Sequence, residues 1–110
     1  MPYINVSTSA KIEDKKKLLE EISILVSSLT NKSKRFVMAK LDDNFEMYFD
    51  DESPCCYLEI KSIGFLSPSE MVKPISNFVN EKMGIPIDKI YISFLDVPAS
   101  MWVWNGRTFG

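Results

Sequence analysis

The stretch that decides the fold is YLEIKS at residues 57–62, because its pattern repeats that of YINVST at residues 3–8. Both stretches alternate apolar and polar side chains, as expected for a β-strand with one buried face. A helix pattern and another strand pattern follow each of them, at an offset of about 54 positions. We therefore expect two βαβ halves, at residues 2–42 and 57–96, within one domain of 110 residues.

Apolar residues at steps of three and four predict one helix in each half. The first helix lies within residues 11–30 and ends at Asn31 as a C-cap residue. The second begins with Ser67 as N-cap, Pro68 at N1 and Glu70 at N3, and ends at Gly84. The expected buried stripes are Leu18, Leu19, Ile22, Leu25, Val26 and Leu29 in the first helix, and Met71, Ile75, Phe78 and Val79 in the second.

Each half closes with a second strand, at residues 36–41 and 90–96. Residues 45–49 suggest a short edge strand before the acidic loop at 50–52. Near the end of the chain, Asn105-Gly106 lies between short apolar runs, which is the strongest short-range signal for a β-hairpin. The tail is therefore expected to be an aromatic hairpin.

These elements predict an α/β protein with a four-stranded sheet. Crossover helices make the strands of each half parallel, and the right-handed rule places both helices on one face. The other face is expected to be bare and apolar. A chain of 110 residues cannot cover that face alone, so we expect further copies of the chain to cover it.

Composition excludes several classes of function. The chain has no His, so His-based triads, His general bases and His metal sites are ruled out. Thirteen Lys and Arg against fifteen Asp and Glu leave no basic surplus for nucleic acid. No Gly-rich phosphate loop is present, and no metal, nicotinamide or flavin is expected. Without a signal peptide or a membrane-spanning run, the expected location is the cytoplasm.

Pro2 is the most unusual candidate for chemistry. A proline after the initiator methionine permits removal of Met1, which would leave a free secondary amine at the N-terminus. Apolar neighbours and nearby cations would lower the pKa of that amine towards neutrality, where a general base works best. The alternative is that Pro2 only starts an edge strand.

Other polar residues lie where strands and helices end. Lys32 follows the first helix and could bind a carboxylate, or be one more surface lysine. Tyr91 and Ser93 are two positions apart on one strand and share a face. Ser62-Ile63-Gly64 ends the third strand, where a glycine permits close approach of a ligand or simply a turn.

The adjacent pair Cys55 and Cys56 has neither disulfide-framework nor metal-ligand spacing. Alternation along a strand predicts one buried and one exposed thiol. A thiol–disulfide oxidoreductase using this pair is the least favoured of the functions considered.

In combination, these residues resemble the macrophage migration inhibitory factor family of the tautomerase superfamily, which includes D-dopachrome tautomerase. The similarity covers essentially the whole chain. It is carried by the order and spacing of Pro2, Lys32, Pro54-Cys55, Ser62-Ile63-Gly64, Asp88-Lys89-Ile90-Tyr91-Ile92, Trp104-Asn105 and Thr108-Phe109.

The resemblance implies a homotrimer with active sites between subunits and a cofactor-free keto–enol tautomerase. Pro2 would be the base, Lys32 would bind the substrate carboxylate or carbonyl oxygen, and Ile63 would give backbone contacts. Tyr91 would come from the neighbouring subunit. Trp104 and Phe109 would form an apolar wall. Implied substrates are phenylpyruvate, hydroxyphenylpyruvate and dopachrome-like compounds; the alternative function is a cytokine-like extracellular protein that binds a receptor.

Some positions depart from the family pattern. Ser93 stands where cytokine-type members have Asn, and Phe36 stands where they have Tyr. Trp102 replaces a smaller aliphatic residue at the rim of the pocket. The family's C-x-x-C motif is broken, because Leu58 stands where the second cysteine would come. These changes bear on substrate preference and on thiol chemistry.

Overall fold

The computed structural model describes residues 1–64 and 66–110. Its main body contains four strands and two helices in the order β1, α1, β2, β3, α2, β4. Their bounds are Tyr3–Thr8 (β1), Lys15–Thr30 (α1), Met38–Asp42 (β2), Cys56–Ser62 (β3), Pro68–Met83 (α2) and Ile90–Asp96 (β4).

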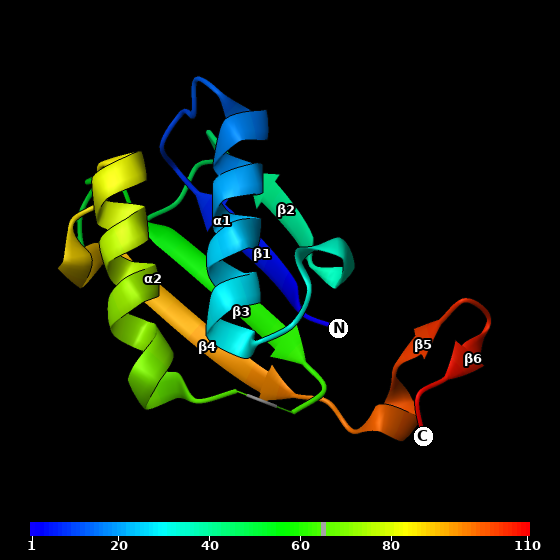
Figure 1. Cartoon of the computed structure of the whole chain (residues 1–110). Coiled ribbons are helices and arrows are strands. Elements are labelled where there is room, and N and C mark those ends of the chain that lie inside the picture. Colours follow the sequence, from blue (N-terminus) through cyan, green and yellow to red (C-terminus); the bar gives the residue numbers. More distant parts are fainter. Residues whose placement is uncertain (65) are drawn as a thin grey trace.

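The sheet has the strand order β2-β1-β3-β4. Within each half the two strands are parallel, and the halves join through an antiparallel pairing of β1 with β3. Both helices lie on one face of the sheet and run in opposite directions (Figure 1). This is the predicted α/β arrangement of two βαβ halves.

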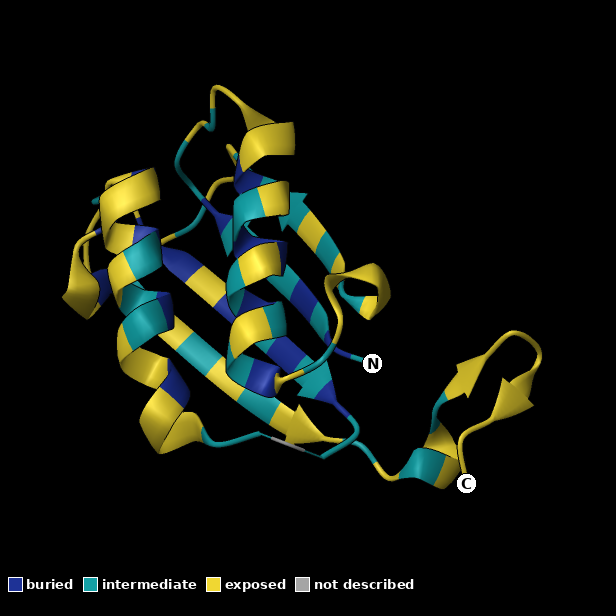
Figure 2. Cartoon of the chain, viewed as in Figure 1, coloured by how far each residue is buried: buried dark blue, intermediate teal, exposed yellow. Residues whose placement is uncertain are grey.

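The core lies between the sheet and the two helices. Ile4 and Val6 of β1 and Leu58 and Ile60 of β3 point towards the helices and are at most 1% exposed. Figure 2 shows the resulting alternation of buried and exposed residues along the strands. Six of the ten predicted stripe residues are fully part of this core: Leu18, Ile22, Val26, Met71, Ile75 and Val79. Leu25, Leu29 and Phe78, also predicted, are partly buried and pack against it.

The opposite face of the sheet differs from the prediction of an apolar surface. Met38, Tyr57, Tyr91 and Leu95 are exposed there, but many other positions on this face are polar or charged. Alternation places Asn5, Lys40, Glu59 and Lys61 there too, because each lies one step from a core position. The prediction is wrong in this respect: the uncovered face is mixed.

Capping decides where the helices begin and end. The predicted range of the first helix started at Lys11, but α1 begins at Lys15 because the Asp14 carboxylate accepts a hydrogen bond from the Lys17 N–H at 3.0 Å. Both helices end on a left-handed residue, Asn31 with φ 55° and Gly84 with φ 70°. Ser67 is the N-cap of α2, although its side chain makes no cap hydrogen bond.

Two predicted strands differ from the structure. The second strand starts at Met38, because Lys34–Phe36 form a 3₁₀ turn (η1). Residues 45–49 form no strand; only an isolated bridge joins Phe49 to Asp51. Left-handed residues on either side, Asn44 and Asp50, turn the chain out of the extended conformation there.

The predicted C-terminal hairpin is present. It follows a 3₁₀ turn at Ala99–Met101 (η3) and consists of β5 (Val103–Trp104) and β6 (Arg107–Thr108). Asn105 and Gly106 both have positive φ, as a two-residue type I′ turn requires. The hairpin projects from the body and is almost fully exposed (Figures 1 and 2).

Among the described residues, the helices are all too short or too polar to cross a membrane.

Candidate active site

The N-terminus is fixed by the sheet itself. Pro2 is buried, and its carbonyl oxygen accepts a hydrogen bond from the N–H of Met38 at 3.0 Å. Because β1 is a central strand, the residue before it is held between β2 and β3. Both chain termini lie at the same end of the sheet, on the side where the hairpin projects (Figure 1).

Lys32 is fixed by the turn that ends α1. Left-handed Asn31 redirects the chain, and the Lys32 N–H donates to the carbonyl of Ser27 at 3.2 Å. The Ser27 hydroxyl donates in turn to the Lys32 carbonyl. This double anchor sets where the lysine side chain starts, close enough to the N-terminus for its charge to act on the terminal amine.

A cavity of about 500 Å³ opens beside Pro2. We call it the proline hollow. Arg35 of η1 and Trp102 at the base of the hairpin also line it. The sequence did not single out Arg35 as a candidate, because it lies among several other charged residues. Its position directly before Phe36 and three residues after Lys32 was the available signal.

A second cavity of about 340 Å³ adjoins the first. We call it the lysine hollow. Lys32, Ile63 and Phe109 line it but do not line the proline hollow. The residues that line both hollows are Met1, Phe36 and Trp104.

Three aromatic side chains form a continuous wall. Phe36 meets Trp104 edge to face, with ring centroids 5.9 Å apart, and Trp104 stacks near Phe109 at 6.5 Å. This wall joins η1 to the hairpin, which otherwise projects freely. A flat apolar ligand placed against these rings would lie beside the N-terminus.

Burial lowers the pKa of the N-terminal amine, and the positive charge of Lys32 lowers it further. Both causes disfavour the charged form. The amine in question is that of Met1; removal of Met1 would transfer the terminus to Pro2, one residue deeper. A neutral amine in an apolar hollow is suited to act as a general base.

Tyr91 and Ser93 are not part of this assembly within one chain. Tyr91 packs on Phe49 with ring centroids 4.6 Å apart, and the Ser93 hydroxyl shares a hydrogen bond of 2.7 Å with the hydroxyl of Tyr57. Both lie on β4, the edge strand on the far side of β3 from β1. They share one exposed face, as the sequence predicted, but another copy of the chain would be needed to bring them to the hollows.

Comparisons with known proteins match the whole length of the chain. The family model described as "Macrophage migration inhibitory factor (MIF)" matches residues 1–110. The chain belongs to the MIF family.

Similar members come from distant organisms. The crystal structure of a MIF homologue from Prochlorococcus marinus is 39% identical and superposes with a TM-score of 0.93, covering 98% of this chain and 99% of that one. The MIF homologue of Brugia malayi is 28% identical over 115 aligned positions and is covered completely, as is this chain. The Trichinella spiralis MIF structure, at 24% identity and a TM-score of 0.90 over 97% of this chain and 99% of that one, shares the fold.

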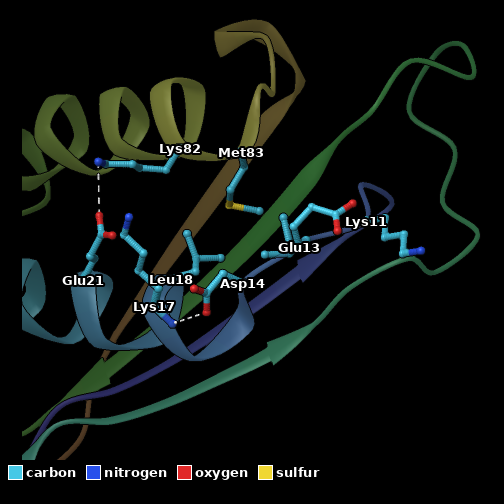
Figure 3. A pocket seen from close by; sticks show the side chains of 9 residues that line it. Lys11, Glu13, Asp14, Lys17, Leu18, Glu21, Lys82 and Met83 are labelled. Carbon is cyan, nitrogen blue, oxygen red and sulfur yellow. Dashed lines mark hydrogen bonds and ion pairs between the residues drawn. The ribbon is translucent and has the colours of Figure 1, made fainter.

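Another hollow, of about 300 Å³, lies between the start of α1 and the end of α2 (Figure 3). Three of its charged groups already have partners in this MIF-family protein. Lys82 forms an ion pair with Glu21 at 3.2 Å, and Asp14 caps the helix. Because the Lys82–Glu21 ion pair joins α2 to α1 and Asp14 caps α1, this hollow offers a weaker case for a site than the two at the N-terminus.

The prediction of one buried and one exposed cysteine is wrong. Cys55 and Cys56 are both buried and both free. Cys55 precedes β3, so strand alternation does not govern it; its N–H donates to the Ser9 hydroxyl, and its carbonyl accepts from Thr8 at 2.8 Å. Burial, and then the neighbouring Cys55, raise the pKa of Cys56 to about 12. Such a thiol is a poor nucleophile.

In the described part of the chain, His, Cys, Asp and Glu side chains form no group of three or more that could hold a metal ion.

Proposed function

We propose that this MIF-family protein is a cofactor-free keto–enol tautomerase whose base is the secondary amine of Pro2 after removal of Met1. One observation carries the proposal: the chain begins in an apolar hollow beside Lys32, where burial and that charge lower the pKa of the terminal amine. Membership of a family that includes tautomerases supports it.

The proposed step is a proton transfer between carbon and oxygen. The neutral Pro2 nitrogen takes a proton from C3 of a 2-keto acid, and the electrons of that C–H bond form the C2–C3 double bond. The π electrons of the carbonyl group move to its oxygen, and the protonated Pro2 nitrogen returns a proton to that oxygen, directly or through water. This gives the enol and restores the neutral amine; the reverse steps give the ketone. Lys32 would hold the substrate carboxylate or carbonyl oxygen, and the Ile63 backbone would add contacts.

The aromatic wall suits an arylpyruvate. Phe36, Trp104 and Phe109 offer ring faces and edges next to the terminus, and Trp102 lines the proline hollow. Phenylpyruvate, hydroxyphenylpyruvate and dopachrome-like compounds are the proposed substrates. A homotrimer would add Tyr91 and Ser93 from a neighbouring subunit.

The test begins with the intact mass of the purified protein. The sample lacking Met1 is then assayed for phenylpyruvate tautomerisation, beside Pro2→Ala and beside a form extended by one uncleaved residue before Pro2. We expect both changes to lower kcat/KM by about 100- to 10,000-fold, the usual contribution of a general base.

Pro86→Ala is the matched control, because Pro86 is exposed and lies in the turn after α2. It should keep the wild-type rate. An extended form as active as the free terminus would contradict the role of Pro2, and a free-terminus protein no faster than buffer would contradict the proposed activity.

A further inference from the structure

The two hollows carry an unbalanced charge. Lys32 lines one and Arg35 lines the other, while none of the described lining residues is acidic. The whole chain, by contrast, has a net charge of −2. Positive charge has therefore been concentrated around an apolar cavity of an acidic protein. The two cationic side chains belong to different hollows, and these hollows share Met1, Phe36 and Trp104.

Arg35 differs from its neighbour in what it contacts. Lys34 pairs with Glu20 of α1 at 3.5 Å. The Arg35 guanidinium lies instead over the Phe36 ring, 5.4 Å from its centroid, and it forms no ion pair among the described residues. The Ser33 hydroxyl accepts the Arg35 N–H at 3.3 Å and so fixes the turn that presents it.

A substrate with one carboxylate can form an ion pair with only one of these two side chains. Lys32 is a point charge, whereas the planar guanidinium of Arg35 matches a carboxylate with two parallel hydrogen bonds. Phe36 and Trp104 line both hollows, so a ligand lying against them would span from one cation to the other.

We propose that Arg35 selects 2-keto acids that carry a second carboxylate at the end remote from the keto group. The inference rests on the proposed function for its reaction and deepens it by naming the substrate class. Arg35 acts as a specificity-determining residue; the proton still moves at Pro2.

The test compares matched pairs of compounds that differ by one charge. Phenylpyruvate is set beside its 4-carboxy and its neutral 4-carbamoyl derivatives, and 2-oxohexanoate is set beside 2-oxoadipate. Exchange of the C3 hydrogens for deuterium, followed by NMR, reports the proton transfer for all five. We expect kcat/KM to be about 10- to 100-fold higher for the dicarboxylate of at least one pair. Salt should reduce this ratio.

Variants assign the preference to one side chain. Arg35→Gln should bring the dicarboxylate to monocarboxylate ratio close to one, and Arg35→Lys should restore part of it. Lys34→Gln, the matched control from the same turn, should keep the wild-type ratio. An Arg35→Gln protein that loses activity on both compounds equally, with the ratio unchanged, would overturn the inference in favour of a structural role.

A direct binding measurement separates this inference from the proposed function. Titration calorimetry with the same compounds measures affinity whether or not they react. If no compound exchanges faster than in buffer, the proposed tautomerase fails, and the affinity ratio and its dependence on Arg35 still decide the inference. Equal affinity for both members of each pair overturns it.

Discussion

In both halves of the molecule the helix is followed by the same kind of turn, but the residues of that turn have different surroundings in the two halves. Asn31 and Gly84 both end a helix in the left-handed conformation, and a 3₁₀ turn follows each of them, at Lys34–Phe36 (η1) and Ile87–Lys89 (η2). The residue after the left-handed position is Lys32 in the first half and Ile85 in the second. Lys32 lines an open hollow, whereas Ile85 is 0% exposed.

The last residue of the 3₁₀ turn also differs between the two halves. In the first half it is Phe36, an aromatic residue that lines both hollows. In the second it is Lys89, which is buried, forms an ion pair with Asp51 at 3.0 Å and donates to the carbonyl of Phe49. One backbone path thus lines the candidate site in one half and anchors a loop in the other.

The largest expected effect is a loss of stability when Ile85 is replaced, which replacement of Lys32 should not cause. Ile85→Ala should lower the free energy of unfolding by about 2–5 kcal/mol, because it leaves a cavity in the core. Lys32→Ala should lower it by less than about 1 kcal/mol but reduce kcat/KM for phenylpyruvate by about 10- to 100-fold. Denaturant unfolding and the tautomerase assay on both variants check this. If both variants lost the same stability, the proposed difference between the two positions would be contradicted.

A smaller effect is expected at the left-handed residues themselves. Gly84→Ala should lower the free energy of unfolding by about 1–2 kcal/mol, because the left-handed backbone conformation is unfavourable for alanine. Steric contact plays no part, since an added Cβ would meet nothing within 4 Å. Asn31→Gly should change stability by at most about 1 kcal/mol, in the stabilising direction. Thermal unfolding of the pair measures both. A neutral Gly84→Ala would mean that the turn after α2 relaxes into another conformation.

The smallest effect is a pH dependence at the ion pair between Asp51 and Lys89, which anchors the loop to the second half. Hydrogen bonds from Ser53, and then the neighbouring Lys89, lower the pKa of Asp51 from 3.8 to about 2. Its contribution to stability is therefore complete above about pH 4 and is lost as pH falls towards 2. Asp51→Asn should flatten the fall of Tm across that range. Parallel curves for the variant and the wild type would contradict this role.

The sequence predicted the body of the fold because its information there is local. Strand alternation at residues 3–8 and 57–62, together with two helical stripes, determines the sheet and the face that the helices cover. Contacts between distant segments are invisible to such patterns. The N–H of Cys55 donates to the hydroxyl of Ser9, 46 positions away, and the backbone of residues 44–50 turns where an edge strand was expected.

Several residues that line the two hollows were predicted one by one, but the sequence did not show how they come together. Pro2, Lys32, Ile63 and Trp104 are far apart in sequence, and only the resemblance to a family grouped them. Their convergence follows from β1 lying at the centre of the sheet and from the hairpin folding back to Phe36. Arg35 was overlooked because nothing local distinguishes an arginine that faces a cavity from one that faces water.

The hydrogen bond from Met38 to the Pro2 carbonyl has a consequence for the proposed base. Catalytic bases on side chains must be frozen into one of several rotamers, and part of the binding energy is used to do so. A nitrogen that belongs to the backbone of a paired strand has no side-chain torsions to restrict, so folding alone sets its position. Small displacements of β2 against the start of β1 would then act on the proposed base as directly as changes in the side chains that line the hollow.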